Sequence, residues 1–346
     1  MSFTLPPDPR TERRARIAQR VGFIFAAVLV VLVAYLGYVG FEGSRQLTDA
    51  PSHSTDCRTP ATMGWTYEAI NYPKRTDRAL KAEPDPERCA AQGSAAGDAL
   101  TSADGTRLAG WYIPSGSGTG PAGPTVVMVH GWGSNKSAML ERAAVLHDAY
   151  NLVIVDLRNH GQSEQTATTQ GVREADDVRA TLDWLAATKA PERVALLGVS
   201  MGGATVLNTV DDERVDAVIV ESTHATMANA AQARLDGQGY PLSLPGSWAI
   251  LLGTLMRTGE DVSSADPVQA ISRMSDRPLL IITGGRDGTI GENDPTDLLA
   301  AAEDATSSAE LRVCKPADHA ASLKDCPEQY AGWVLGFLER VLADAG

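Results

Sequence analysis

The sequence predicts an α/β fold in which a mostly parallel β-sheet is covered by helices on both faces. Continuous runs of β-branched and other apolar residues are typical of strands that are buried on both faces of such a sheet. Six such runs alternate with segments that suit helices, and this alternation favours parallel strands joined by right-handed crossovers. The six runs are residues 125–130, 151–156, 193–198, 215–220, 278–283 and 309–315.

Residues 21–41 form the first distinctive element, because they contain no charged side chain. As a helix this segment would be about 30 Å long, which matches the hydrocarbon core of a bilayer. Tyr35, Tyr38 and Phe41 lie near its end, as aromatic residues do at membrane interfaces. A cleaved secretory signal has a shorter apolar region followed by a small-residue cleavage site, and that pattern is not found here. The sequence therefore predicts a retained transmembrane helix over 21–41.

The charges before this segment predict its orientation. Residues 1–20 carry five arginines against Asp8 and Glu12. Because positively charged flanks stay on the cytoplasmic side, we expect residues 1–20 in the cytoplasm and all residues after Phe41 outside it. The polar segment 42–60 is then expected to be a tether, and the remaining residues, 61–346, a folded domain on the outer side of the cell membrane.

The net charge of the chain bears on its partners. The formal net charge is −13 and the sequence pI is about 4.9. Such a surface repels a phosphate backbone, and no run of lysine and arginine interleaved with aromatic residues is present, so nucleic acid binding is not expected. The sequence gives no indication of the oligomeric state.

Four cysteines follow the apolar segment, in a compartment that permits disulfides. Three pairings are possible, and proximity along the chain favours Cys57 with Cys89 and Cys314 with Cys326. Four buried free thiols are the alternative. Because no CxxC or HxxxH spacing is present, we expect neither a metal site nor a cofactor.

Two segments of the predicted domain suit helices on the faces of the sheet. Residues 175–187 place Val178, Leu182 and Leu185 at helical spacing, and residues 328–342 give a helix at the end of the chain.

A short motif indicates catalysis by a serine. The stretch "GVSMG" at residues 198–202 follows a predicted strand and precedes a segment that suits a helix. This is the context of a nucleophile elbow, a sharp turn that holds a serine hydroxyl above the sheet. The turn requires small flanking residues, which explains the glycines around Ser200.

In this motif and four further ones the chain resembles the alpha/beta-hydrolase superfamily, and the resemblance extends from about Met63 to the C-terminus. Within it, the resemblance is to membrane-anchored or secreted bacterial serine hydrolases of the esterase, lipase-like and serine-aminopeptidase-like type. The stretch 73–99, which contains Cys89, departs from the family as an insertion between the first two strands. The further motifs are "HGWGSNK" (130–136), "DLRNHGQS" (156–163), "ITGGRDGTI" (282–290) and "ADHA" (317–320).

The resemblance implies the role of each site residue. In the family order of serine, acid and histidine, Ser200 is the nucleophile, Asp287 the acid that orients the base, and His319 the general base. The backbone N–H groups of Met201 and Trp132 are the implied donors to the oxyanion. Other acids and histidines compete for these roles: Glu221 and Asp294 for the acid, and His130, His160 and His224 for the base.

An insertion of about fifty residues, 222–275, is expected to form a helical cap over the serine, as the family commonly has. It contains an apolar cluster that either lines an acyl pocket or packs the cap against the core. The expected function is that of a membrane-tethered serine hydrolase that cleaves carboxylic esters through an acyl-enzyme. A peptidase of the serine-aminopeptidase-like type and a catalytically silent scaffold are the alternatives. The cluster consists of Trp248, Ile250, Leu251, Leu252, Leu255 and Met256.

Overall fold

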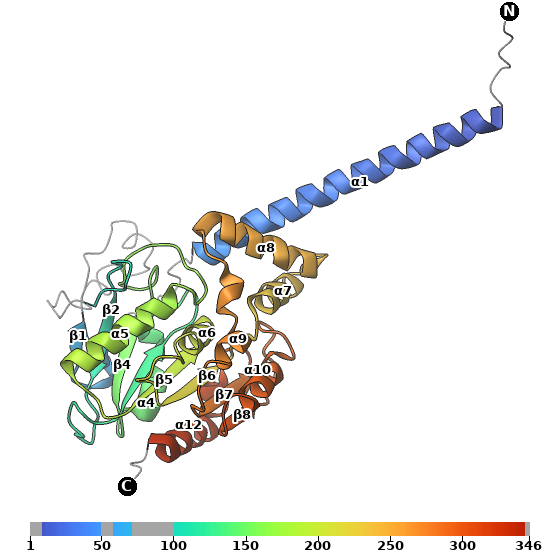
Figure 1. Ribbon diagram of the computed structural model, residues 1–346. Helices are drawn as coiled ribbons and strands as arrows, with labels where there is room; N and C mark the ends of the chain where they lie inside the picture. The colour runs from blue at the N-terminus through green and yellow to red at the C-terminus, as the bar shows by residue number, and fades with distance from the viewer. Residues whose placement is uncertain (1–8, 50–57, 71–99, 343–346) are drawn as a thin grey trace, which may run out of the picture.

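The computed structural model describes residues 9–49, 58–70 and 100–342. Eight strands in these ranges form one sheet, in the order β1-β2-β4-β3-β5-β6-β7-β8 (Figure 1). Strand β2 is antiparallel to both of its neighbours, and the strands from β3 to β8 are parallel. The strands are β1 (Glu68–Ile70), β2 (Ala109–Ile113), β3 (Thr125–Val129), β4 (Asn151–Asp156), β5 (Val194–Val199), β6 (Ala217–Glu221), β7 (Leu279–Gly284) and β8 (Ala309–Cys314).

The six apolar runs form β3 to β8, so the predicted α/β fold is confirmed. Successive residues of the central strands pack against different helices: Val127 lies in a core layer with α5, α6, α9 and α10, whereas Val126 and Met128 lie in a layer with α4 and α12. Helices therefore cover both faces of the sheet, which explains the continuous rather than alternating apolar runs. These helices are α4 (Leu140–Leu146), α5 (Glu174–Thr188), α6 (Met201–Leu207), α9 (Pro267–Ile271), α10 (Asp294–Glu303) and α12 (Pro327–Leu342).

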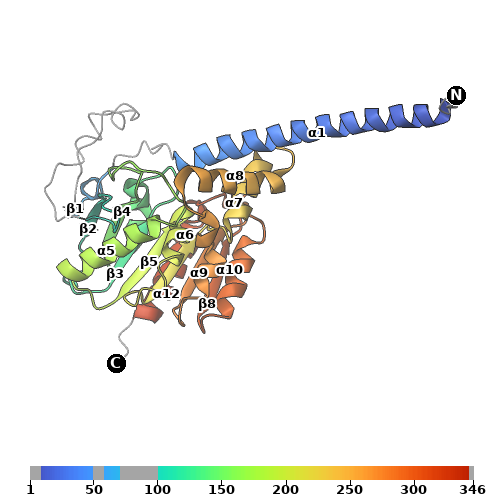
Figure 2. The same ribbon diagram turned by 45° about the horizontal axis from the view of Figure 1, so that its top comes forward.

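Helix α1 (Pro9–Thr48) is longer than the predicted span at both ends. Its N-terminal part projects away from the folded domain, and its last turns lie against the cap (Figures 1 and 2). The expected tether 42–60 is therefore wrong in its first residues, 42–48, which are helical. In this stretch Glu42 accepts hydrogen bonds from its helical neighbours Arg45 at 2.6 Å and Gln46 at 3.1 Å, and such pairs support a helix.

The predicted cap contains α7 (Met227–Gly237), α8 (Ser243–Thr258) and the short 3-10 helix η3 (Val262–Ala265). The last part of the predicted insertion 222–275 does not belong to the cap. Ala270 and Ile271 of α9 pack in the hydrophobic core against the sheet. Short elements complete the described fold, and the predicted insertion 73–99 lies outside the described residues. These elements are the 3-10 helices η1 (Pro60–Met63) and η2 (Lys136–Met139), and α11 (Ser322–Asp325).

A buried ion pair fixes the loop after β3 to the loop after β4. The Lys136 ammonium donates to the Asp156 carboxylate, and both side chains are almost fully buried. Asp156 also accepts from the backbone N–H groups of Lys136 at 2.7 Å and Gln162 at 2.8 Å. Burial alone would raise the pKa of Asp156, but the charge of Lys136 and these hydrogen bonds hold it below its usual range.

We expect Asp156→Ala to lower the free energy of unfolding by about 3–5 kcal/mol, because it removes the carboxylate that faces a buried ammonium. Urea unfolding of the full chain in detergent measures the change. Asp183→Asn is the matched control, since Asp183 pairs with Arg214 at an exposed site, where a pair contributes about 1 kcal/mol or less. Equal effects of the two substitutions would contradict the prediction.

Candidate active site

Ser200 lies at the sharp turn between β5 and α6, as the motif predicts. Its backbone has φ 55° and ψ −120°, a conformation that residues other than glycine rarely adopt. The Ser200 N–H donates to the carbonyl of Glu221 at 2.8 Å, which ties the turn to β6. A Cβ at Gly202 would collide with the backbone of Val129 and His130, so the turn accepts only glycine there.

The structure brings the three residues Ser200, His319 and Asp287 together at the carboxyl edge of the parallel strands. His319 Nε2 lies 2.9 Å from Ser200 Oγ. His319 Nδ1 lies 3.0 Å and 2.9 Å from the two carboxylate oxygens of Asp287. Because an ionised carboxylate only accepts, the Nδ1 proton is donated to Asp287, and Nε2 is left to accept the serine hydroxyl.

Asp287 is held in its charged form. Burial alone would raise the pKa of this carboxyl, but the hydrogen bond and charge of His319, the Thr289 N–H at 3.0 Å and the Ser222 hydroxyl lower it below its usual value. A carboxylate in this state stabilises an imidazolium on His319.

The competing acids have other partners. Glu221 accepts from Arg142 Nε at 2.7 Å and from the Tyr330 hydroxyl at 3.1 Å. Asp294 accepts from the Asn229 amide and the Gly291 N–H, each at 2.7 Å. Neither carboxylate is hydrogen-bonded to His319.

The competing histidines are buried. His130 Nε2 accepts from the Leu157 N–H at 3.2 Å, and His160 Nε2 accepts from the Gly133 N–H at 3.1 Å, so both hold loops in place. Burial lowers the pKa of His130 to about 4 and also lowers that of His160. His224 lines the cavity that contains Ser200, and among the described residues its Nε2 has no hydrogen-bond partner.

The two expected oxyanion donors lie beside Ser200. Met201 is the first residue of α6, so its N–H has no acceptor within that helix. The loop that carries Trp132 runs close to the serine, since a Cβ on Gly131 would lie 3.2 Å from Ser200 Cβ. Both Met201 and Trp132 line the same cavity as Ser200 and His319.

This cavity has a volume of about 530 Å³. Its walls come from the loops around Ser200, from α7 and α8, and from the last turns of α1. The sequence predicted none of the α1 residues here. Of the apolar cap cluster, Ile250 lines the cavity, Leu251 is buried, and the other four side chains are exposed. The α1 residues in the wall are Tyr38, Val39, Glu42, Gly43, Gln46 and Leu47.

Two supporting contacts were not predicted from the sequence. Arg142, which pairs with Glu221, also donates to the carbonyl of Ala320 at 2.8 Å. The Ser222 hydroxyl accepts from the Ala320 N–H at 2.9 Å. Both contacts therefore hold the residue that follows His319. No local motif marks Arg142, because its partners are distant in the sequence.

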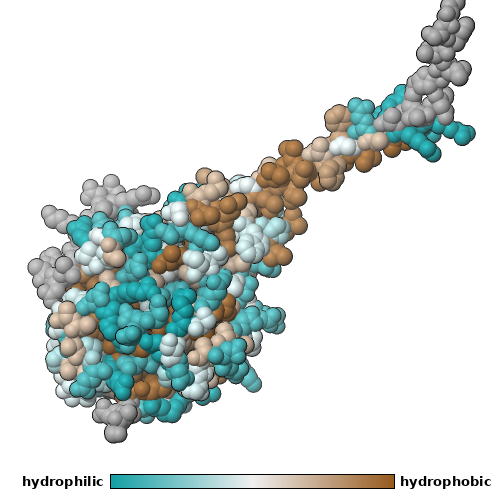
Figure 3. Space-filling view, viewed as in Figure 1, coloured by the Kyte–Doolittle hydropathy of each residue, from teal (hydrophilic) through white to brown (hydrophobic). Residues whose placement is uncertain are grey.

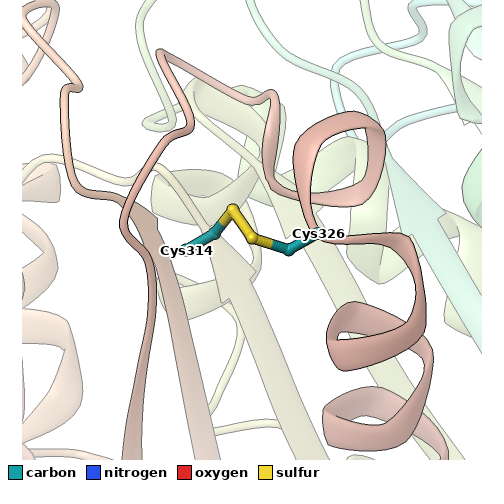
Figure 4. The surroundings of a disulfide bond; sticks show 2 residues. All are labelled: Cys314 and Cys326. Atoms are coloured by element: carbon teal, nitrogen blue, oxygen red, sulfur yellow. A yellow bond between two sulfur atoms is a disulfide. The ribbon is translucent and has the colours of Figure 1, made fainter.

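Cys314 and Cys326 form a disulfide with a sequence separation of 12 residues (Figure 4). Cys314 is the last residue of β8 and Cys326 precedes α12, so the bond closes the segment that carries His319. Cys57 and Cys89 lie outside the described residues. In the part of the chain that the structure describes, no group of three or more His, Cys, Asp or Glu side chains is placed to hold a metal ion.

A family model described as the alpha/beta hydrolase family matches residues 126–333. The chain belongs to this family. Protein YfhR of Salmonella typhimurium is 32% identical to this hydrolase in an alignment of 221 positions, and the match covers 59% of the chain and 68% of that protein. The pimeloyl-[acyl-carrier protein] methyl ester esterase of Aeromonas salmonicida is 37% identical in an alignment of 112 positions, and the match covers 31% of the chain and 41% of the esterase.

The fold is shared with a solved structure of the Pyrococcus furiosus esterase Pf2001. The TM-score is 0.62, with 20% sequence identity, and the likeness covers 83% of this hydrolase and 97% of the esterase. At this identity the likeness concerns the fold alone.

We expect the double substitution Cys314→Ser with Cys326→Ser to slow hydrolysis by about ten- to a hundredfold, because a misplacement of His319 by about 1 Å has an effect of that size. It should also lower the free energy of unfolding by about 3 kcal/mol, the value for closing a loop of this length. Turnover of a short-chain ester and thermal unfolding measure the two effects. Unchanged turnover would contradict a role of the disulfide in positioning His319.

Proposed function

We propose that this alpha/beta hydrolase is a membrane-tethered serine hydrolase that cleaves carboxylic esters through an acyl-enzyme on Ser200. The observation that carries the proposal is the geometry of His319, which lies 2.9 Å from Ser200 Oγ through one ring nitrogen and 2.9 Å from Asp287 through the other. A serine hydroxyl is a weak nucleophile at neutral pH, and an adjacent base of this kind activates it.

In the proposed reaction, Ser200 Oγ attacks the carbonyl carbon of the ester while its proton passes to His319 Nε2. The C–O bond to the leaving alcohol then breaks, and the alcohol oxygen takes that proton. Water attacks the acyl-serine with the same base, which releases the carboxylic acid and restores Ser200. Asp287 stabilises the imidazolium in both halves of the reaction.

The backbone N–H groups of Met201 and Trp132 are proposed to bind the oxyanion of each tetrahedral intermediate. Both residues line the cavity beside Ser200. In comparable enzymes, loss of one such donor costs about 10²- to 10³-fold in turnover.

An ester substrate is supported by two observations. The cavity around Ser200 includes the apolar side chains of Val39, Met227, Leu235 and Ile250. One of the relatives, from Aeromonas salmonicida, is a methyl ester esterase, although the match covers 41% of it. An apolar wall of this kind suits an acyl chain or a hydrophobic alcohol.

The membrane tether is supported by the composition of α1 and by its contacts. Residues 16–48 are long and apolar enough to cross a membrane. The carbonyl of Leu47 accepts from Trp132 Nε1 at 3.1 Å and from Gln170 Nε2 at 3.0 Å. Removal of α1 as a cleaved signal would expose these donors and open the cavity wall, which favours a retained helix.

We expect Ser200→Ala to abolish both ester hydrolysis and covalent labelling by a fluorophosphonate probe, because the nucleophilic oxygen is lost. Turnover of a p-nitrophenyl short-chain ester and of an aminoacyl p-nitroanilide, with gel detection of the probe, gives the measurement. Ser115→Ala is the control, since Ser115 is a buried serine that does not line the cavity. Labelling that survives in Ser200→Ala contradicts the nucleophile, and faster turnover of the anilide than of the ester contradicts the ester preference.

We expect an N-terminal tag to remain covalently joined to the hydrolase domain and to stay on the cytoplasmic side. A protease added to intact cells should digest the domain after Phe41 and leave the tag protected, because the arginines before the span keep that end inside. Immunoblots of the tag and the domain, before and after the membrane is broken, measure this. A domain that is digested only in broken cells would show the orientation to be wrong.

A further inference from the structure

The outer face of α8 carries a stripe of exposed apolar side chains. Trp248 is 58% exposed and Met256 is 81% exposed. The stripe repeats at three- to four-residue intervals, so its members lie on one side of the helix. Soluble proteins rarely expose several large apolar side chains next to one another. Such a patch typically marks a surface that contacts a membrane or another protein. The stripe consists of Leu244, Trp248, Leu252, Leu255 and Met256.

The distribution of exposed apolar residues is uneven over the described chain. Apart from Val313, every exposed large hydrophobic side chain among the described residues lies on α1, on α8 or at Leu242, which immediately precedes α8. Figure 3 shows the apolar surface of α1 continuing onto the cap beside it. The α8 stripe is therefore continuous with the surface that is proposed to face lipid.

Close packing fixes α8 on α1. A Cβ on Gly40 would lie 2.6 Å from the carbonyl oxygen of Ala249, and a Cβ on Gly253 would lie 2.5 Å from the carbonyl oxygen of Gly40. Only glycine at these positions lets the two backbones approach so closely, as in packed membrane helices. The position of α1 in a membrane therefore fixes the position of α8.

Contacts between the two helices indicate the depth of the cap. The Tyr35 hydroxyl donates to the carbonyl of Pro241 at 2.5 Å, just before α8 begins. Tyr35 lies six residues before Phe41, the end of the charge-free run, so this contact is about 9 Å inside that end. Helices that lie in the membrane interface insert their apolar face by about 5–10 Å, which is the same range.

The cavity also extends to the charge-free part of α1. Tyr38 lies within the charge-free run, is 59% exposed, and lines the cavity together with Ser200. Val39, which follows it, is buried against the cap and also lines the cavity. The space above Ser200 thus extends to a part of α1 that is proposed to lie in the membrane.

We infer that α8 rests in the membrane interface and that the substrate is an ester of a bilayer-resident lipid, which enters the cavity from the lipid side past α1 and α8. This inference rests on the proposed function, whose substrate class it narrows. The lipid bilayer, not a soluble partner, covers the α8 stripe, because the stripe continues the apolar surface of the helix that spans it.

The triple substitution Trp248→Ser, Leu252→Ser and Met256→Ser tests the inference in the full chain reconstituted in phosphatidylcholine vesicles. None of the three residues lines the cavity. We expect hydrolysis of a fluorogenic long-chain ester dissolved in the vesicles to fall by about tenfold or more, since the apolar face no longer inserts. Hydrolysis of water-soluble p-nitrophenyl acetate should change less than about twofold, because the triad is untouched.

Val313→Ser is the matched control, since Val313 is 45% exposed but lies on β8, away from α1 and α8. It should alter neither rate. If the triple variant cleaves the long-chain ester at the unchanged rate, or loses both activities equally, the inference is overturned. If the unsubstituted protein does not cleave p-nitrophenyl acetate and is not labelled by a fluorophosphonate, the proposed function itself fails.

A second readout does not depend on activity. Brominated phosphatidylcholine quenches tryptophan only on contact, so the unsubstituted protein should lose more emission in such vesicles than Trp248→Phe does. Equal quenching of the two proteins would show that Trp248 does not touch lipid. If that result were accompanied by crosslinked dimers through α8, a second copy of the chain would cover the stripe, and the inference would be wrong.

Discussion

The turn at Ser200 is the constraint on which the arrangement of the site depends. The chain leaves β5, adopts a positive φ at a serine, and enters α6 so closely that Gly202 touches the backbone of β3. Such a conformation persists only where its surroundings over-determine it. Here the Ser200 N–H is bonded to the end of β6, and the glycines allow α6 to press against the sheet.

The partners of Ser200 reach it because parallel strands end at one edge of the sheet. Asp287 follows β7 and His319 follows β8, so both loops start on the same side as the elbow. Long loops do not hold hydrogen-bond geometry unless they are fixed elsewhere. The loop of His319 is held by the Cys314–Cys326 disulfide and by the contacts of Ala320 with Arg142 and Ser222.

The sequence was informative where structure is set by local pattern. Strands β3 to β7 are buried along their whole length, so their apolar runs could be read directly, and the elbow required glycines at fixed spacing. The antiparallel strands β1 and β2 have no such signal, because β1 has only three residues and β2 (AGWYI) contains a glycine and two aromatic residues instead of a β-branched run. The sequence alone leaves Glu221 as a competing acid, because its partner Arg142 is 79 positions away. In the fold, Arg142 donates to the buried Glu221 carboxylate.

The contact of α1 with the cap could not be predicted for a further reason. A charge-free segment is typical of a membrane span whatever lies beside it, and polar residues after it are typical of a tether. What decides the structure is the fit of glycines more than two hundred positions apart: Gly40 of α1 meets Ala249 and Gly253 of α8. No periodicity within either helix indicates that these residues lie in contact.

This contact couples α1 to the candidate active site. The carbonyl of Leu47, near the end of α1, accepts from the side chain of Trp132, whose backbone N–H is a proposed oxyanion donor. The next carbonyl, that of Thr48, accepts from the Asn159 amide at 3.1 Å and the Thr168 N–H at 3.0 Å. The last carbonyls of a helix have no partner within it, and here donors of the hydrolase domain satisfy them. A movement of α1 along its axis would break these bonds and shift Trp132, so the position of α1 on the domain and the geometry of the proposed oxyanion hole are set by the same interactions.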